Sequence, residues 1–464
     1  MPAAIRPANR IVNRVLRFTV ANLTRLRFRA RYDAGVLDSV QPPFLLIGNH
    51  TCNFDAFLMS LPVKGPIHFV ASDEYFRTPL LRFLLRLVGG IPKIKNVSDL
   101  QPVRRMLALK KAGAVIGIYP EGNRSWDGLT GPLFGSTAKL IKLFRIPVLA
   151  VETTGGSLSH PRWARFARTG RMHLDYRLLF TAEDCGSLSE KELFVKMVAA
   201  LAHDDHPDAV KRAARTGEPF RFRGRRLAER LELYLFQCPS CRQTDTLASR
   251  DDRLRCTACG LTVRYGEDGR FHPADPSLRA TPVPFSLTRD WDRWQRGNLQ
   301  EAIRSWASFP QIPPLPESGI PGCGTPASCS IKMACGTPGS CSIKKAPGRS
   351  SGRDTILLKN TGAFLRTGGR YGKLKPAGSG TILLHPDRLA FRLTGPGAET
   401  LSWPLAGISG LNIQYNNRFE FYHHDILHRF SFPEHPVSVW KWHQALLYAM
   451  EAQPSQDAGP TEQV

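Results

Sequence analysis

The sequence predicts an α/β core, a small cysteine-rich module and a C-terminal antiparallel β-barrel capped by one helix. Three observations carry this prediction. Between residues 40 and 180, short apolar runs alternate with amphipathic runs, as expected for layered strands and helices. Two Cys-x-x-Cys pairs follow between residues 238 and 259. After residue 354, short strand-like runs separated by turn residues precede a final amphipathic stretch.

The chain is strongly basic. Its 464 residues include 63 Lys and Arg against 39 Asp and Glu, which gives a formal net charge of +24. This excess favours anionic partners such as a membrane surface, a nucleic acid or a phosphorylated substrate. A hydrophobic fraction of 42% excludes wholesale disorder, and no apolar run is long enough for a conventional membrane-spanning helix. Ten Cys in a chain this long exclude a disulfide scaffold and favour a reducing compartment.

Residues 1–35 are predicted to form basic amphipathic helices that associate with a membrane. The segment Met1–Ala30 contains no acid, while Arg and apolar residues interleave at roughly helical spacing. Arg14 and Arg17 interrupt the continuous apolar core that a secretory signal needs. A helix with its cationic face toward anionic headgroups fits this pattern. The alternative is a first helix that packs on its own domain and keeps a solvated Arg face.

Residues 36–235 are predicted to form the α/β core. Four apolar runs are typical of buried strands: Phe44–Gly48, Ile67–Ala71, Ala114–Tyr119 and Val148–Glu152. Amphipathic runs predict helices at Pro79–Val88, Gln101–Ala112, Ser136–Phe144, Glu190–His203 and Arg225–Phe236. Strands that alternate with helices indicate an α/β layer fold.

Residues 236–272 are predicted to be a zinc ribbon. The two Cys-x-x-Cys pairs, separated by fourteen residues, supply four thiolates: Cys238, Cys241, Cys256 and Cys259. Four thiolates at this spacing suit a closed tetrahedral structural zinc site and leave no coordination position open for catalysis. Zinc ribbons bind nucleic acid, bind protein or only stabilise a small module, so the ribbon alone indicates no function.

Residues 273–353 are predicted to contain one helix and a low-complexity linker. The helix is expected within Ser286–Ser308, and the following stretch is rich in Pro, Gly and Ser. A twelve-residue unit occurs twice in this stretch, at Cys323–Ala334 and Cys335–Ala346. Two units are too few for a solenoid, so the pattern favours a tandem duplication in a tether.

Residues 354–452 are predicted to form the β domain, with Ser438–Met450 as its closing helix, and residues 453–464 a disordered tail. Seven or eight strand-like runs occur between residues 355 and 432. By strand count and order alone, this region resembles a pleckstrin-homology or GRAM-type barrel.

Three His residues are followed by an Asp five positions later: His50/Asp55, His68/Asp73 and His203/Asp208. His68 begins a strand, which would place Asp73 about 16 Å away along it. His203 lies in a run of charged residues and is expected at the surface.

The first pair has a different context. His50 follows the apolar run Phe44–Gly48, and Asn53 can cap a helix that begins at Phe54. A strand end that turns into a helix start can fold Asp55 back onto His50. His50 would then be an exposed base oriented by Asp55. The alternative is a structural His–Asp contact.

A second polar motif follows another predicted strand. Pro120-Glu121-Gly122-Asn123-Arg124-Ser125 comes directly after the run that ends at Tyr119. Gly122 allows a tight turn, and backbone N–H groups with the Arg124 guanidinium can hold an anion there. A lone motif of this kind could be a surface turn, but its order and spacing after His50–Asp55 are specific.

With these motifs the sequence resembles the glycerolipid acyltransferase family, that of the 1-acylglycerol-3-phosphate acyltransferases. Its four blocks are similar to Asn49–Asp55, Gly90–Lys95, Tyr119–Ser125 and Ile146–Val148, in that order. Two positions depart from the family pattern. Asn123 stands where the family usually has Thr, and Lys95 takes the place of an Arg, with Pro92 in place of an aromatic residue. Since Lys binds phosphate as a point charge, the acceptor head group can differ.

The resemblance implies a fold with a mixed sheet, docked on the membrane by N-terminal helices, and a set of residue roles. It implies His50 as the general base for an acceptor hydroxyl, with Asp55 fixing its tautomer. The acyl donor would be acyl-CoA or acyl-ACP. Arg124 and Lys95 would bind the acceptor phosphate. Glu121, Gly122 and Ser125 would also belong to the substrate-binding site, with Glu121 ordering the turn or binding the glycerol hydroxyls.

We therefore expect an acyltransferase of phospholipid biosynthesis or remodelling, located peripherally or monotopically at the cytoplasmic face of a membrane. Its partners would be a lysophospholipid, an acyl thioester and an anionic membrane surface, while nucleic acid is unlikely. The alternative is a nucleic-acid-binding or adaptor protein that acts through the ribbon and its basic flank. A third reading, a catalytically idle relative that binds lipid through its β domain, is disfavoured by the intact His50, Asp55, Glu121 and Arg124.

Overall fold

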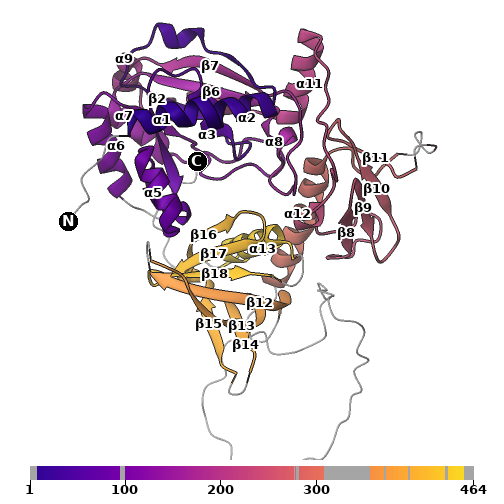
Figure 1. Ribbon diagram of the computed structural model, residues 1–464. Helices are drawn as coiled ribbons and strands as arrows, with labels where there is room; N and C mark the ends of the chain where they lie inside the picture. Colours follow the sequence, from indigo (N-terminus) through magenta and orange to yellow (C-terminus); the bar gives the residue numbers. More distant parts are fainter. Residues whose placement is uncertain are drawn as a thin grey trace, which may run out of the picture.

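The computed structural model describes residues 8–94, 100–275, 277, 282–307, 356–369, 372–395, 398–433 and 437–453. Figure 1 shows three parts: an α/β core, a small ribbon module and a C-terminal β domain below the core. The expected linker repeat and C-terminal tail lie outside the described residues.

A seven-stranded mixed sheet forms the centre of the core. Its spatial order is β1-β7-β6-β2-β5-β3-β4. The strands are β1 (Arg31–Asp33), β2 (Leu45–Gly48), β3 (Ile67–Ser72), β4 (Ile91–Lys93), β5 (Val115–Ile118), β6 (Val148–Thr154) and β7 (His173–Phe180). Only β6 and β7 pair antiparallel, whereas the other neighbours pair parallel. The expected mixed sheet is confirmed.

Both faces of this sheet are covered, which explains why its strands are continuously apolar. Along β2, Leu45 and Ile47 belong to one apolar cluster and Leu46 to another, because successive side chains point to opposite faces. The first cluster takes in α6 (Gln101–Lys111), α7 (Ser136–Phe144), α9 (Ala182–Ser187) and α10 (Glu190–Leu201). The second takes in α3 (Asp55–Ser60) and the end of the N-terminal helical run.

The acid-free N-terminus forms α1 (Arg10–Leu16), a short π-helical stretch (Arg17–Ala21) and α2 (Asn22–Arg27). The run lies across the core in Figure 1. Phe28, directly after α2, is buried, whereas Ile11 and Phe18 are 75% and 77% exposed. The end of this segment packs on the core, and an apolar stripe of its helices remains exposed.

Other short helices connect the strands or follow the sheet. They are a 3₁₀ turn (Gly35–Asp38), α4 (Asp73–Arg77), α5 (Pro79–Leu87), α8 (Gly156–Ser159) and α11 (Asp205–Thr216). Helix α5 carries further exposed apolar side chains, with Leu80 at 67% and Phe83 at 60% exposure. Among the described residues, no helix combines the length and apolar character needed to cross a bilayer.

The ribbon module is a four-stranded antiparallel sheet with the order β11-β10-β9-β8. Its strands are β8 (Leu247–Arg250), β9 (Arg253–Cys256), β10 (Thr262–Tyr265) and β11 (Phe271–Pro273). The helix expected at Arg225–Phe236 is wrong: only a 3₁₀ turn forms, at Leu231–Leu233. The N–H groups of Leu227, Ala228 and Arg230 bond to the β8–β9 hairpin instead of to a preceding helical turn.

The β domain is a seven-stranded antiparallel sheet with the order β15-β14-β13-β12-β18-β17-β16. Its strands are β12 (Leu358–Gly369), β13 (Lys375–Leu384), β14 (Arg388–Leu393), β15 (Thr400–Pro404), β16 (Ser409–Gln414), β17 (Arg418–His423) and β18 (Ile426–Ser431), with a 3₁₀ turn at Leu405–Gly407. The single capping helix is α13 (Val439–Glu451), whose Trp442 and Leu446 are fully buried. Among the described residues β15 and β16 are its edges, so the sheet is an open half-barrel.

An aromatic joint connects the three parts. Trp126 of the core stacks on Tyr234, which precedes the ribbon, at 5.5 Å between ring centroids, and lies 5.2 Å from Trp440 of α13. The Trp440 indole N–H donates to Asp292 of α12 (Thr288–Ala307) over 2.7 Å. One apolar cluster consequently runs from the ribbon through α12 and α13 into the β domain.

Candidate active site

The turn between β2 and α3 brings His50 and Asp55 together. The Asp55 carboxylate is fully buried, and its Oδ2 lies 2.8 Å from His50 Nδ1. The same oxygen accepts the backbone N–H groups of Thr51 and Cys52 over 2.7 and 2.9 Å. The expected cap by Asn53 is wrong: helix α3 begins at Asp55 and has no side-chain cap. The Asp55 carboxylate closes the turn instead, because a buried charge needs several donors.

Glu121 ties the two motifs to each other. Its Oε1 accepts the His50 N–H over 2.7 Å, and its Oε2 accepts the Gly131 N–H over 2.8 Å. The Ser125 N–H donates to the His50 carbonyl over 2.9 Å. Burial raises the pKa of Glu121 to about 8, although the two N–H groups act in the opposite direction. Glu121 therefore links the turn after β2 to the loop that follows the second motif.

The rest of the second motif is also held by local contacts. Gly122 adopts φ +65°, and a Cβ there would lie 2.6 Å from the Phe134 ring, so glycine is required on both counts. Ser125 Oγ accepts the Gly128 N–H and contacts Asp127. Gly122 and Ser125 thus shape the loop. Lys95, the remaining predicted binding residue, lies outside the described residues.

Arg124 is a half-buried cation that has no carboxylate partner among the described residues. Burial lowers the pKa of Arg124, and the charge of the nearby Asp55 carboxylate acts in the opposite direction. A guanidinium in this setting favours an anionic ligand, because the desolvated charge otherwise has no counter-ion.

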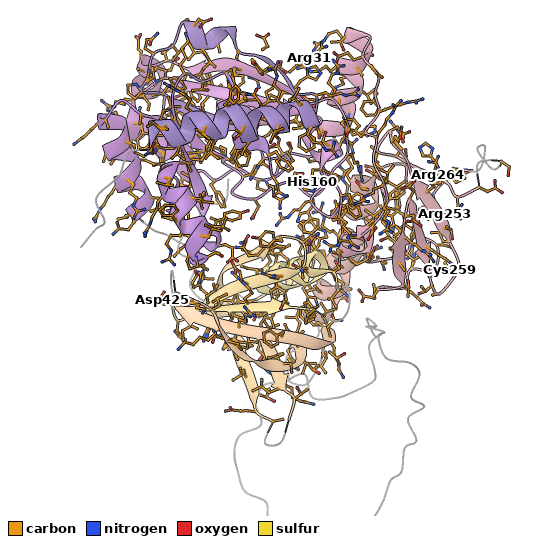
Figure 2. All side chains as sticks on the ribbon, in the orientation of Figure 1. Arg31, His160, Arg253, Cys259, Arg264 and Asp425 are labelled. Carbon is orange, nitrogen blue, oxygen red and sulfur yellow. The ribbon has the colours of Figure 1, made fainter. Side chains whose placement is uncertain are left out.

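Two aromatic residues beside the motifs were missed by the sequence analysis. The Tyr119 ring stacks on His50 with 4.2 Å between centroids and fixes the plane of the imidazole. Figure 2 labels His160 on the side of the core that faces the β domain. Burial, and then the charge of Arg124, lower the pKa of His160 to about 4, so its imidazole is neutral at neutral pH. Tyr119 borders a motif, whereas His160 has no sequence signal.

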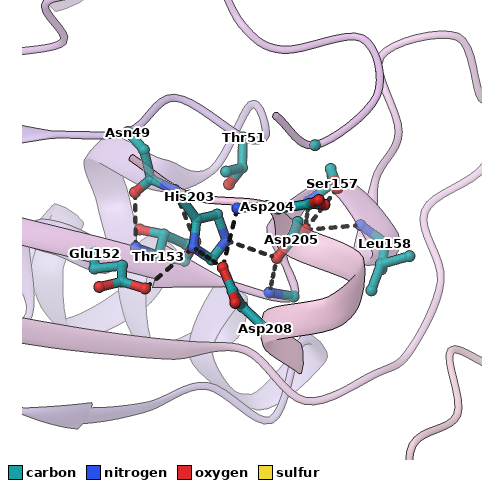
Figure 3. A network of polar contacts seen from close by, with 12 residues as sticks. Asn49, Thr51, Glu152, Thr153, Ser157, Leu158, His203, Asp204, Asp205 and Asp208 are labelled. Carbon is teal, nitrogen blue, oxygen red and sulfur yellow. Dashed lines mark hydrogen bonds and ion pairs between the residues drawn. The ribbon is translucent and has the colours of Figure 1, made fainter. Parts of the chain in front are cut away.

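The other two His–Asp pairs differ from the first. His68 Nδ1 bonds to the Gly89 carbonyl over 2.9 Å, and Asp73 pairs with Arg77. The surface position expected for His203 is wrong, because its side chain is completely buried. Its Nδ1 contacts Glu152 at 3.1 Å and Asp208 at 3.3 Å, and its Nε2 contacts Asp205 at 3.2 Å (Figure 3). The charged run turns inward because these carboxylates surround one imidazole.

The His203 cluster stabilises the loops that carry the two motifs. Asp205 accepts the N–H groups of Gly155 and Ser157, and the His203 carbonyl accepts the Thr130 N–H. Beside it, the Asn49 side chain makes two bonds with the backbone of Thr153 (Figure 3). The cluster thus fixes the end of β6 and the loop after the second motif, on which Glu121 depends.

The four ribbon cysteines form a candidate metal centre. Their Sγ atoms all lie within 4.8 Å of one another. The pairs Cys238–Cys259 and Cys241–Cys256 are each 3.7 Å apart. Tetrahedral zinc with bonds of about 2.3 Å requires sulfur separations of about 3.8 Å. The donor set therefore fits zinc, and Figure 2 shows Cys259 toward the outer end of the ribbon.

A model of the acyltransferase family matches residues 19–153. This stretch contains the His50–Asp55 turn and the Glu121–Ser125 loop. Residues 19–153 thus form an acyltransferase-family domain. It is 25% identical over 121 residues to the chloroplastic 1-acyl-sn-glycerol-3-phosphate acyltransferase BAT2 of Brassica napus, which covers 26% of this chain and 35% of that protein. It is 27% identical over 97 residues to the chloroplastic LPAT1 of Arabidopsis thaliana, which covers 20% of this chain and 27% of that protein.

The chain thus spans about a third of the length of these curated relatives. Two solved structures are also similar to parts of it. The acyltransferase PlsC of Thermotoga maritima aligns with 40% of this chain and 79% of its own, at 18% identity and a TM-score of 0.34. The N-terminal PH domain of human ARAP2 aligns with 26% of this chain and 100% of its own, at 18% identity and a TM-score of 0.17.

The buried His203 makes stability depend on pH. Burial alone would lower its pKa, but the bonds to Asp205 and Glu152 raise it from 6.5 to about 10. A pKa raised by folding stabilises the protein fully below pH 6.5, and this contribution is lost as pH rises toward 10. We expect the melting temperature to fall between pH 6.5 and pH 10 more in the wild type than in His203→Gln. Parallel curves for the two proteins would show that His203 is not charged.

The ribbon should carry tightly bound zinc. Protein purified without added metal should contain about one zinc atom per chain by elemental analysis, since four thiolates form a closed site. The double variant Cys238→Ser/Cys256→Ser should lose this zinc. Cys185→Ser, which alters a buried thiol outside the ribbon, should keep it. A wild-type protein that is folded but free of zinc would contradict the assignment.

Proposed function

We propose that this protein transfers an acyl group from acyl-CoA or acyl-ACP to the hydroxyl of a lysophospholipid such as 1-acylglycerol 3-phosphate. The observation that carries the proposal is the His50–Asp55 contact of 2.8 Å at the carboxyl end of β2. The His50 side chain is 23% exposed, whereas Asp55 is fully buried. Since Asp55 accepts at Nδ1, the Nε2 atom is the one suited to take a proton from an acceptor hydroxyl.

In the proposed reaction, His50 Nε2 removes the hydroxyl proton while the acceptor oxygen attacks the thioester carbon. A C–O bond forms, the C–S bond breaks, and the proton passes from His50 to the leaving thiolate. Asp55 stabilises the transient imidazolium. Cys52 does not serve as a nucleophile: burial and the neighbouring Asp55 raise its pKa well above the usual range, so it remains a thiol.

Arg124 is the proposed binding residue for the acceptor phosphate. It follows the Glu121 loop, lacks a carboxylate partner among the described residues and lies near the neutral His160. A guanidinium can hold a phosphate through two parallel hydrogen bonds. Lys95 is proposed to assist on the same phosphate.

Peripheral membrane association is part of the same proposal. The exposed apolar side chains of α1, the π-helical stretch and α2 accompany several Arg, and α5 adds a second exposed apolar surface. An apolar face next to cationic residues suits an anionic membrane surface.

The contrast between two histidines tests the catalytic assignment. His50→Ala should lower acyl transfer about 10²–10⁴-fold, because a positioned general base typically contributes that much. His68→Gln should retain transfer, since His68 bonds to a backbone carbonyl of its own domain. Thiol release from acyl-CoA with added lysophosphatidate measures both. Equal loss in two folded variants would refute His50 as the base, and no release by the wild type would favour the nucleic-acid or adaptor alternative.

The role of Arg124 predicts a selective effect. Arg124→Ala should raise the KM for lysophosphatidate about tenfold or more, as expected for the loss of a charged hydrogen bond, and leave the KM for acyl-CoA almost unchanged. Arg145→Ala alters an exposed arginine at the end of α7 and serves as the control. A change confined to the KM for acyl-CoA would contradict the assignment.

Membrane binding should depend on salt and on the N-terminal apolar stripe. Co-sedimentation with vesicles rich in anionic lipid should fall at high salt, because surface charges are screened within about 10 Å at 0.1 M salt. Ile11→Glu/Phe18→Glu should reduce binding at low salt as well. Val195→Glu changes an exposed apolar residue on α10 and should leave binding unchanged. Equal binding by both variants would exclude α1 as an anchor.

A further inference from the structure

The β domain is fixed to the α/β core by a buried charge network on α4. Glu74 of α4 forms an ion pair with Arg429 of β18, which also pairs with Glu420 of β17 at 2.6 Å. Arg77 of α4 donates to the Gly372 carbonyl over 2.9 Å. These charged side chains are at most 12% exposed. Such partners hold the two domains in one defined orientation, because separating them would leave charges without counter-ions.

A second contact joins the β domain to the catalytic loop itself. The buried Arg162 donates to the Arg124 carbonyl over 2.8 Å. The same guanidinium donates to the carbonyls of Ile413 and Tyr415 over 3.0 and 3.2 Å. Asn416 adds a bond to the Trp163 carbonyl. The turn between β16 and β17 is therefore placed relative to Arg124 by one shared side chain.

Tyr415 occupies this turn in an unusual conformation. Its φ is +57°, in the left-handed region that bulky side chains rarely adopt. Asparagine adopts this region more readily, but Asn416 and Asn417 occupy the next two positions of the turn. Its side chain is 43% exposed, with Arg418 above its ring. Backbone strain of this kind persists where the surroundings impose it and is frequent at binding sites.

Two tyrosines, one from each domain, lie near Arg124. Arg162 bonds to the carbonyls of both Arg124 and Tyr415, which places the Tyr415 turn beside the Arg124 loop. Tyr75 of α4 and Tyr415 are both close enough to Arg124 to influence its pKa, and Tyr75 is close enough to Tyr415 to influence the pKa of that phenol. Glu74, the carboxylate nearest in sequence to Tyr75, is already paired with Arg429. The surroundings of Arg124 thus offer hydroxyl groups, a neutral imidazole and no available carboxylate among the described residues.

We propose that the β domain completes the acceptor pocket, with the Tyr415 hydroxyl donating to the phosphate monoester held by Arg124. The proposal rests on the acyltransferase function and deepens it, because it makes Tyr415 a specificity-determining residue. A phosphate monoester has three terminal oxygens that can accept from Arg124, Tyr75 and Tyr415. The phosphodiester of a phosphocholine head group leaves only two terminal oxygens to accept from the same donors.

Two substitutions at Tyr415 separate its hydroxyl group from its backbone conformation. Tyr415→Phe removes only the hydroxyl, and Tyr415→Asn removes the ring while tolerating the left-handed turn. His424→Asn is the matched control, since His424 is exposed, has φ +46° and lies in the next hairpin turn of the same domain. Figure 2 labels its neighbour Asp425 at the left edge of the β domain.

Both Tyr415 variants should raise the KM for lysophosphatidate about tenfold, the typical effect of losing one hydrogen bond to a charged group, with kcat and the KM for acyl-CoA within twofold. They should also reduce the preference for lysophosphatidate over lysophosphatidylcholine. The control should match the wild type. An unchanged KM for lysophosphatidate in both variants, or equal rises for acceptor and donor, would overturn the proposal.

A binding measurement distinguishes failure of this proposal from failure of the proposed function. Glycerol 3-phosphate should raise the melting temperature of the wild type, of His50→Ala and of the His424→Asn control, and should have a smaller effect on both Tyr415 variants. A wild type that lacks transfer but shows this pattern would refute the acyltransferase function and keep the anion pocket. Equal stabilisation of the wild type and the Tyr415 variants would refute the role of Tyr415 whatever the enzyme assay gives.

Discussion

A buried carboxylate requires several hydrogen-bond donors, and this chain meets the requirement with the backbone of its own functional loops. Asp55 accepts two N–H groups of the turn after β2, and Glu121 accepts one from that turn and one from the loop after the second motif. Asp205 accepts the N–H groups of Gly155 and Ser157 after β6. Each loop is thus fixed at the sheet edge by the carboxyl group of a buried side chain, and the orientation of His50 depends on this arrangement.

The added modules are part of the same arrangement. Trp126 follows the Arg124 loop by two residues and packs against Tyr234 and Trp440, so ribbon, α12 and α13 all meet the core at this point. Arg162 lies over the Trp126 ring and bonds to both the Arg124 loop and β16. These contacts hold the ribbon module in a defined position relative to the core and the β domain.

Local patterns predicted the features that depend on local sequence. The alternation of apolar and amphipathic runs gave the mixed sheet, and the strand–turn–helix context singled out His50 among three identical spacings. The patterns failed where contacts between residues far apart in the sequence determine the local structure. His203 stands in a charged run but is buried because Glu152 and Asp205 surround it, and residues 225–236 lose their helix to the β8–β9 hairpin. His160 lies near Arg124 because of the fold of the core, and Tyr415 approaches the Arg124 loop only through the arrangement of the domains, so no sequence spacing could reveal either residue.

The Arg162 contacts have a consequence for how the site is assembled during synthesis. Tyr415, whose carbonyl Arg162 contacts, lies 253 positions further along the chain. A nascent chain that has emerged as far as the ribbon already contains His50, Asp55 and Arg124, yet the Arg162 guanidinium lacks two of its three carbonyl acceptors. Domains generally fold as they leave the ribosome, N-terminal first. The Arg124 loop therefore gains its contact with the turn between β16 and β17 only after the last strands have been synthesised.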